Sequence, residues 1–209
     1  MDNLEKNKLT ETLMKTRDKK IPLFGICLGL QLFFDSSEEF GTSKGLGLIK
    51  GNVKKLPKIS LENQRLKIPN MGWFKVDLNN QFINDKFSKF VKSINENDLY
   101  YFVHSFFVDP IEKKNIAATY NFGGHKIPAI VSKDNFIGCQ FHPEKSGKKG
   151  LEIISNFLKL LANSSLVPTP SVLDTIRGFL IFNGLRSNTD PKPPILLSLI
   201  HISEPTRPY

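Results

Sequence analysis

The sequence predicts a domain of the α/β class, and three observations support this prediction. Short apolar segments typical of strands alternate with helical segments over the first 162 residues. An apolar run at 21–26 ends at a glycine-flanked turn, and a helical pattern starts directly after it. A helix with one continuous apolar face closes the pattern at 150–161.

Each element follows from its local pattern. Segment 3–16 is expected to be an amphipathic helix, because its leucines recur at helical spacing. The strand at 21–26 leads into a helix over 28–35, and the glycines of 41–51 indicate a loop. Further strands are expected where β-branched and aromatic residues lie between turn signals, at 66–78, 98–108, 116–120, 129–131 and 136–141.

The composition changes near residue 163, so we expect one domain over residues 1–162 and a tail over 163–209 that does not belong to it. The chain has 209 residues and 13 prolines, and 7 of these prolines lie in the tail. The tail also contains more arginine than lysine, unlike the rest of the chain. Residues 197–207 resemble the translation of a synthetic sequencing-library adapter, so the tail is expected to be artefactual at least from 197.

The composition also excludes several classes of protein. The net charge is +9, but the lysines are spread along the chain instead of clustering on one element, so no nucleic-acid partner is expected. The longest apolar stretch, 21–34, is too short to span a bilayer, so no membrane association is expected. Cys27 and Cys139 are too few for a disulfide framework and lack the spacing of metal ligands, which predicts a cytoplasmic protein without a metal.

A candidate nucleophile lies at the end of the first strand, in the run Gly25-Ile26-Cys27-Leu28-Gly29. This run has the form of a nucleophile elbow, with cysteine in place of serine. The sharp turn presents the side chain, and the first turn of the following helix favours thiolate over thiol. The backbone N–H of Leu28 is expected to point to the place where an oxyanion would form.

A candidate base lies at the end of the last strand, in the run Gly138-Cys139-Gln140-Phe141-His142-Pro143-Glu144. His142 at a strand end can take the proton of a thiol and return it to a leaving amine. Glu144 can hold the imidazole in the required tautomer. His104 is a rival base, but no acid follows it closely, so a structural or substrate-framing role is favoured, and Cys139 is expected to serve packing.

The two motifs together resemble those of the class I glutamine amidotransferases. Further segments narrow the resemblance to the glutaminase subunits of imidazole glycerol phosphate synthase, namely Pro69-Asn70-Met71-Gly72-Trp73, Tyr101-Phe102-Val103-His104-Ser105 and His142-Pro143-Glu144-Lys145-Ser146. The resemblance implies an open, mostly parallel sheet with flanking helices. The family carries further strands and a glycine-rich oxyanion loop ahead of the nucleophile helix, where only 26 residues precede Cys27. The chain is therefore expected to be a domain truncated in front, whose first strands are missing.

The resemblance also implies the chemistry and the roles of single residues. Glutamine would be hydrolysed through a Cys27 thioester without a cofactor, with His142 as the base and Glu144 as its orienting acid. The ammonia would pass to a (β/α)8-barrel cyclase subunit in histidine biosynthesis. The residues expected to bind the substrate are Leu28, Gln31, Glu39, Ser105 and Phe106, and those expected to face the partner are Trp73 and Lys145.

Alternative functions stay open at this point. A paralogue that feeds a surface-sugar amidotransferase is one, because Asn70 and Phe74 stand where the family usually has histidine and asparagine. An inactive gene fragment is another, in which strand 21–26 lies at a sheet edge that lacks some of its neighbours. A Cys–His peptidase is less favoured, because it would not need the glutamine-framing Gln31.

Overall fold

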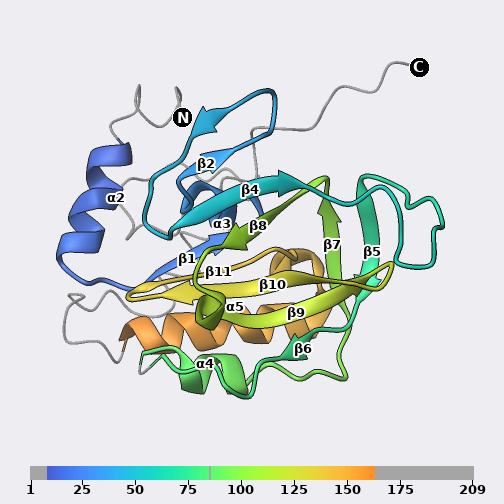
Figure 1. The fold of residues 1–209 in the computed structure, drawn as a ribbon. Helices are drawn as coiled ribbons and strands as arrows, with labels where there is room; N and C mark the ends of the chain where they lie inside the picture. The colour runs from blue at the N-terminus through green and yellow to red at the C-terminus, as the bar shows by residue number, and fades with distance from the viewer. Residues whose placement is uncertain (1–8, 85, 163–209) are drawn as a thin grey trace, which may run out of the picture.

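The computed structural model describes residues 9–84 and 86–162, and it confirms the α/β class (Figure 1). The helices are α2 (Leu9–Asp18), α3 (Leu28–Leu32), α4 (Ser88–Lys92) and α5 (Gly147–Ala162), with 3-10 turns η1 (Lys113–Asn115) and η2 (Pro143–Lys145). The central sheet has the strand order β1 (Leu23–Ile26), β11 (Phe136–Cys139), β10 (His125–Lys133), β9 (Ile116–Phe122) and β6 (Asp77–Leu78). A second sheet has the order β3 (Ser43–Lys44), β2 (Ser36–Ser37), β4 (Gly51–Lys55) and β8 (Phe106–Pro110), and β5 (Asn70–Phe74) pairs with β7 (Tyr100–His104).

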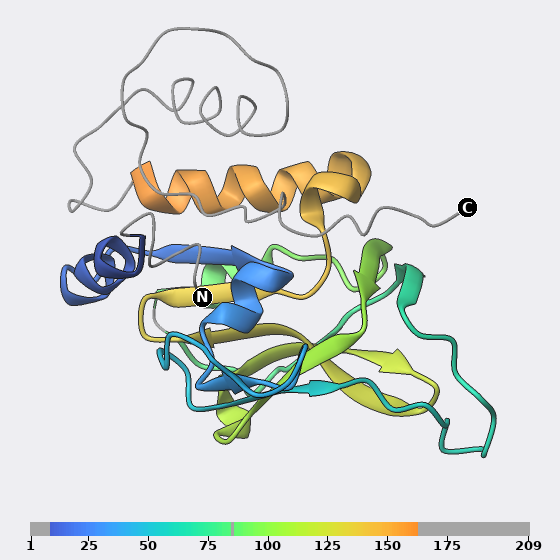
Figure 2. The ribbon, with the colours of Figure 1, turned by 90° about the horizontal axis from the view of Figure 1, so that it is seen from above.

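Helix α5 and the second sheet lie on opposite faces of the central sheet, as Figure 2 shows from above. A hydrophobic cluster packs on each face. Successive residues of β1 point to opposite faces, because side chains alternate along a strand. Leu23 packs with α2, α3 and the second sheet, whereas Phe24 packs with α4 and α5. The ring of Phe24 lies 5.1 Å from that of Phe157 in α5 and 5.9 Å from that of Phe90 in α4. Strand β1 is thus buried on both faces.

The sheets are mixed, and here the structure differs from the mostly parallel sheet that the resemblance implied. Strand β1 pairs with β11 in parallel and β2 pairs with β4 in parallel, but the other ladders between described strands are antiparallel. In the central sheet, short connections explain the antiparallel pairing of β10 with β9 and with β11. Gly123 and Gly124 form the turn between β9 and β10, and Asp134 has a positive φ in the turn between β10 and β11. Such tight hairpins permit only antiparallel neighbours.

Strand β1 lies at the edge of the central sheet, as expected, and has β11 as its neighbour among the described strands. Two glycines let this pair and helix α3 approach closely. A Cβ atom on Gly25 would come within 2.7 Å of the Gly29 carbonyl carbon, and one on Gly138 within 2.8 Å of the Gly25 oxygen. Because β1 and β11 are parallel, the residues that follow them emerge at the same edge of the sheet.

Replacing Gly25 by alanine should lower the free energy of unfolding by about 2–3 kcal/mol, because the new methyl group meets backbone atoms that cannot move aside. Gly41→Ala is a suitable comparison, since a Cβ there meets nothing within 4 Å and only the positive φ of 95° opposes it. The comparison variant should lose about 1 kcal/mol. Urea unfolding curves of both variants measure the difference, and equal losses would contradict the close approach.

Some predicted strands were too long, and some observed elements were not predicted. The predicted strand 98–108 is two strands, because the chain leaves the partner β5 at Ser105 and joins β4 as β8. Likewise 66–78 contains two strands, β5 and β6. The short strands β2, β3 and β4 and helix α4 were not predicted. The beginning of the first predicted helix and the whole tail, 163–209, lie outside the described residues.

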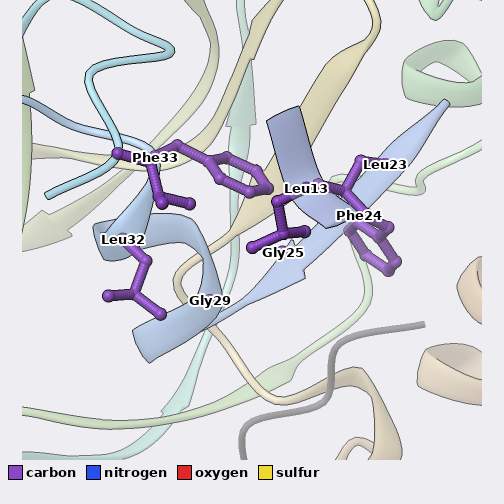
Figure 3. A pocket seen from close by; sticks show the side chains of 8 residues that line it. Leu13, Leu23, Phe24, Gly25, Gly29, Leu32 and Phe33 are labelled. Atoms are coloured by element: carbon purple, nitrogen blue, oxygen red, sulfur yellow. The ribbon is translucent and has the colours of Figure 1, made fainter. Parts of the chain in front are cut away.

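A small apolar pocket lies beside β1, between helices α2 and α3 (Figure 3). Its lining includes Leu13, Leu23, Gly29 and Leu32, and none of its lining residues carries a polar side chain. This pocket is therefore a packing feature of the core and offers nothing to orient a polar ligand.

Candidate active site

Cys27 occupies the sharp turn between β1 and α3. Its backbone has φ 50° and ψ −102°, a conformation that residues other than glycine adopt rarely and at a cost in free energy. Its N–H donates a hydrogen bond of 2.8 Å to the carbonyl of Cys139 at the end of β11, which continues the parallel ladder into the turn. Leu28 is the first residue of α3, where backbone N–H groups have no acceptor within the helix. The elbow predicted from the sequence is present.

His142 and Glu144 follow β11 at the same edge of the sheet. The His142 Nδ1 lies 2.7 Å from Glu144 Oε1, and both side chains are about nine-tenths buried. The His142 N–H donates to the Tyr101 carbonyl at 2.8 Å, and the Ser146 hydroxyl donates to the His142 carbonyl at 2.6 Å. The imidazole is thus held with its Nδ1 towards the carboxylate, which leaves Nε2 for other work.

Cys27 and His142 are brought together by the structure, and the pKa of His142 reflects this. Burial opposes the charged imidazole, but hydrogen bonding with the Cys27 sulfur and with the Glu144 carboxylate outweighs it and raises the His142 pKa to about 9. The second carboxylate oxygen of Glu144 is buried without a hydrogen-bond partner among the described residues. The arrangement therefore favours a protonated imidazole beside the cysteine.

Gln31 and Gln140 link the cysteine to strand β8. The side-chain amide of Gln31 donates to the Phe106 carbonyl at 3.0 Å and to Gln140 Oε1 at 3.3 Å. Gln140 in turn donates from Nε2 to the sulfur of Cys27 at 3.4 Å. Because both protons of the Gln31 amide are used within the protein, its carbonyl oxygen is the atom left for a ligand.

A groove of about 490 Å³ opens beside this network. The residues that line it are Glu38, Glu39, Phe40, Lys55, Ile68, Ser105 and Phe106. Three of the predicted substrate residues, Glu39, Ser105 and Phe106, thus share one cavity. Burial raises the pKa of Glu39. Ser105 lies between the end of β7 and the start of β8, and this change of strand places the backbone of Ser105 and Phe106 at the groove.

A model of the class-I glutamine amidotransferase family matches residues 3–161 of the chain. The chain belongs to the class-I glutamine amidotransferases. One relative, from Prochlorococcus marinus, is 47% identical over 161 residues and is named imidazole glycerol phosphate synthase subunit HisH; the match covers 77% of this chain and 70% of the relative. A relative of the same name from Methanocaldococcus jannaschii is 43% identical, over 77% of this chain and 74% of the relative.

The fold agrees with this membership. A crystal structure of a glutamine amidotransferase superposes with a TM-score of 0.51 and 14% sequence identity, and it covers 76% of this chain and 71% of that chain. The Bacillus subtilis relative, also named imidazole glycerol phosphate synthase subunit HisH, is 38% identical over 79% of this chain and 74% of its own length. Sequence and fold therefore both support the membership of this chain in the class-I glutamine amidotransferases.

His104, the rival base, is buried within the amidotransferase domain and occupied on both ring nitrogens. Its Nδ1 lies 2.8 Å from the Phe106 carbonyl, and its Nε2 lies 2.9 Å from the hydroxyl of Tyr120. Burial lowers the pKa of His104 to about 4, so the ring is neutral at physiological pH. His104 therefore acts as a structural link between strands, which supports the interpretation favoured from the sequence.

The residues expected to face a partner lie on two elements that border β7. Trp73 on β5 is half exposed and packs edge-on against Tyr101 of β7, with ring centroids 5.7 Å apart. Lys145 is exposed on η2, directly after Glu144, and η2 also contacts β7. The structure thus places both residues on the amidotransferase surface near the end of the site that holds His142.

Several residues of the site were missed from the sequence alone, and Gln140 and Lys55 illustrate why. Gln140 reaches the Cys27 sulfur, and Lys55 lines the groove. A signal for Gln140 existed, because it is a polar residue inside the apolar run 136–141 and is fully buried. No such signal marked Lys55, which becomes part of the groove only through the pairing of β4 with β8.

Neither a metal site nor a membrane span is found in the part of the chain that the structure describes. Within residues 9–84 and 86–162, no three side chains of the metal-binding types His, Cys, Asp and Glu gather as ligands would. None of the helices in these ranges has the length and hydropathy needed to cross a bilayer.

Proposed function

We propose that this chain is the glutaminase subunit of an imidazole glycerol phosphate synthase, in which it hydrolyses glutamine to glutamate and ammonia. The observation that carries the proposal is the placement of Cys27, after β1, and His142, after the parallel strand β11, at the same edge of the sheet, with the imidazole held by Glu144 and its pKa raised by the Cys27 sulfur. Membership of the class-I amidotransferases and the names of the relatives support the same function. The ammonia then passes to a (β/α)8-barrel cyclase subunit in the cytoplasm.

The first half of the reaction forms a thioester. His142 holds the proton that it has taken from the Cys27 thiol, and the thiolate attacks the carboxamide carbon of glutamine. The oxygen of that carboxamide becomes an oxyanion, to which the Leu28 N–H donates. As the carbon–nitrogen bond breaks, His142 returns the proton to the leaving nitrogen, which departs as ammonia.

The second half releases glutamate. A water molecule gives a proton to His142 and attacks the thioester carbon, and the carbon–sulfur bond breaks. The sulfur leaves as the thiolate beside the imidazolium that His142 has become, so the enzyme returns to its initial state. Throughout both halves Glu144 keeps the Nδ1 side of the imidazole occupied, so that the same ring nitrogen serves as base and acid.

The groove suits the backbone end of an amino acid. The carboxylate of Glu39 complements the α-ammonium group, and the backbone N–H groups of Ser105 and Phe106, which line the same groove, would donate to the α-carboxylate. The free carbonyl oxygen of Gln31 adds a further acceptor between the groove and Cys27. Trp73 and Lys145 then form part of the surface that contacts the cyclase.

The surface-sugar alternative rested on Asn70 and Phe74, and the structure offers no support for using these residues to choose a partner. Asn70 is buried and donates to the Tyr120 hydroxyl at 3.0 Å. The ring of Phe74 packs against Tyr120 and Phe102 within the core. Both residues therefore serve packing inside the domain, and their identity does not distinguish one partner from another.

The proposed function is tested by measuring glutamate release from glutamine by the purified 209-residue chain in three mixtures: alone, with an imidazole glycerol phosphate synthase cyclase subunit, and with a surface-sugar synthase. Release that increases when the cyclase is present supports the proposal. Release that depends instead on a surface-sugar synthase would favour the paralogue. An absence of release with either partner would favour the inactive fragment.

Replacing Glu39 by glutamine should raise KM for glutamine by about 10–100-fold with little change in kcat, because a charge-assisted contact to the bound substrate is lost. Glu38→Gln is the matched control, since Glu38 lines the same groove but already accepts the Lys55 N–H at 3.4 Å. Its KM should change less than about threefold. A larger effect from Glu38 than from Glu39 would reverse the assignment of the ammonium site.

A further inference from the structure

We propose that Gln140 is a catalytic residue of this site, which donates a hydrogen bond to the sulfur of Cys27 and stabilises it as a thiolate. The effect on glutamine turnover rests on the proposed function, but the effect on the sulfur itself does not. The observations that carry the proposal are the burial of Gln140, its 3.4 Å contact with Cys27 and the fixed orientation of its amide.

The backbone of Gln140 is held firmly beside the nucleophile. Gln140 directly follows β11, and its N–H donates to the Ala129 carbonyl of β10 at 2.8 Å. The preceding residue, Cys139, accepts the N–H of Cys27 at 2.8 Å. The Gln140 side chain is fully buried and Cys27 is partly buried, so the donor end of the contact with the sulfur is shielded from water. A hydrogen bond in such surroundings is stronger than one exposed to solvent.

The amide of Gln140 can present only its NH₂ group to the sulfur. The Phe106 carbonyl, which Gln31 links to Gln140, determines this orientation. The Phe106 carbonyl can only accept, so the Gln31 group that contacts it is the NH₂ group. That same NH₂ group faces Gln140, which must present its oxygen to Gln31. The NH₂ group of Gln140 is therefore the one that lies against Cys27.

The Phe106 carbonyl, at which this series of hydrogen bonds begins, is also held by a second group. His104 Nδ1 donates to it at 2.8 Å, and Tyr120 occupies the other ring nitrogen of His104. Asn70 donates in turn to the Tyr120 hydroxyl at 3.0 Å. Because each of these groups has a partner, rotation of the Gln31 amide would leave buried polar atoms unpaired, which is costly.

The donor of Gln140 complements the charge of His142. Imidazolium stabilises the thiolate only while His142 holds its proton, and His142 gives that proton to the departing ammonia. The amide of Gln140 does not titrate, so its N–H is in place both when the thiolate attacks glutamine and when the sulfur leaves again as thiolate, whichever proton His142 holds at that moment. The site thus keeps one donor on the sulfur through every step.

The test replaces Gln140 by methionine, which has a similar volume and no donor. The rate at which iodoacetamide alkylates Cys27 is followed at about pH 7 by mass spectrometry of the Cys27 peptide, which separates it from Cys139. We expect alkylation about tenfold slower than in the unchanged chain, because iodoacetamide reacts with the thiolate and the variant removes a hydrogen bond that stabilises it. An unchanged or faster rate in folded protein would overturn the proposal.

Two further variants separate donor loss from damage to the fold. Gln140→Glu keeps an acceptor for Gln31 and replaces the donor by a carboxylate, so alkylation should be slowed at least as much as by methionine. Ser132→Ala removes another buried polar group of the sheet, which bonds the Phe136 carbonyl and does not touch Cys27. That variant should alkylate at the unchanged rate, and equal slowing in all three variants would overturn the proposal.

Glutamine turnover then connects the inference to the proposed function. The methionine variant should show a kcat about tenfold lower with KM changed less than about twofold, because the lost interaction acts on the sulfur and not on bound glutamine. If the unchanged chain releases no glutamate while alkylation still depends on Gln140, the proposed function fails and the role of Gln140 stands.

Discussion

Cys27→Ala should abolish glutamate release from glutamine, with a loss of at least about 10⁴-fold in kcat. The reason is that no other side chain of the described site can form the thioester. The second cysteine, Cys139, is fully buried in β11, and burial raises its pKa well above the usual thiol range, so it cannot replace Cys27 as a nucleophile. Glutamate release with the cyclase subunit present measures the loss.

Added ammonia provides the control for this variant. The thiolate is needed only to release ammonia, so the alanine variant together with its cyclase should still support synthesis when ammonium salt replaces glutamine. An electrophilic glutamine analogue should label the unchanged chain at Cys27 and leave the variant unlabelled. Glutamate release close to that of the unchanged chain would show that Cys27 is not the nucleophile.

His142→Asn should lower kcat by about 10³–10⁴-fold, the second largest effect expected at this site. The variant removes the group that accepts the thiol proton and returns it to ammonia, and it leaves the buried Glu144 carboxylate without the imidazole. Imidazole added to the buffer should restore part of the activity, because a small base can enter the space that the ring leaves. Turnover within about tenfold of the unchanged chain would contradict the role of His142 as base.

The same variant changes how stability depends on pH. The folded-state pKa of His142 is raised from 6.5 to about 9, so its protonation stabilises the folded state fully below pH 6.5 and is lost as the pH rises through 9. The unchanged chain should therefore lose more stability than His142→Asn between about pH 6.5 and about pH 9.5. Urea unfolding at these two pH values measures the difference, and parallel losses would show that His142 is not stabilised as a cation.

The parts of the site that sequence reasoning recovered depend on neighbours along the chain. The elbow around Cys27 and the pair of His142 with Glu144 are each confined to a few consecutive residues, so their local structure could be predicted. The α/β class followed in the same way from alternating apolar segments. A resemblance to a known family then added the residues of the groove, of which Glu39 and Ser105 do share one cavity.

The parts that were missed depend on contacts between distant segments. The predicted strand at 98–108 reads as one continuous apolar pattern, and only the competing partners β5 and β4 divide it at Ser105. Gln140 lies 113 positions from Cys27 in the sequence, so nothing in either local pattern reveals the hydrogen bond between them. The mixed sheet has a local cause, the tight turns, but the family resemblance outweighed that signal.

The parallel pairing of β1 with β11 also determines which kinds of genetic change this site can survive. Ile26 is in register with Cys139. Cys27 is the next residue after Ile26, and His142, three residues after Cys139, has its pKa raised by the Cys27 sulfur. Deleting one residue between 136 and 141 would move His142 by about 3.3 Å along the strand direction and turn the following side chains to the opposite face. Lineages that retain activity should therefore exchange many residues of these segments while conserving their lengths.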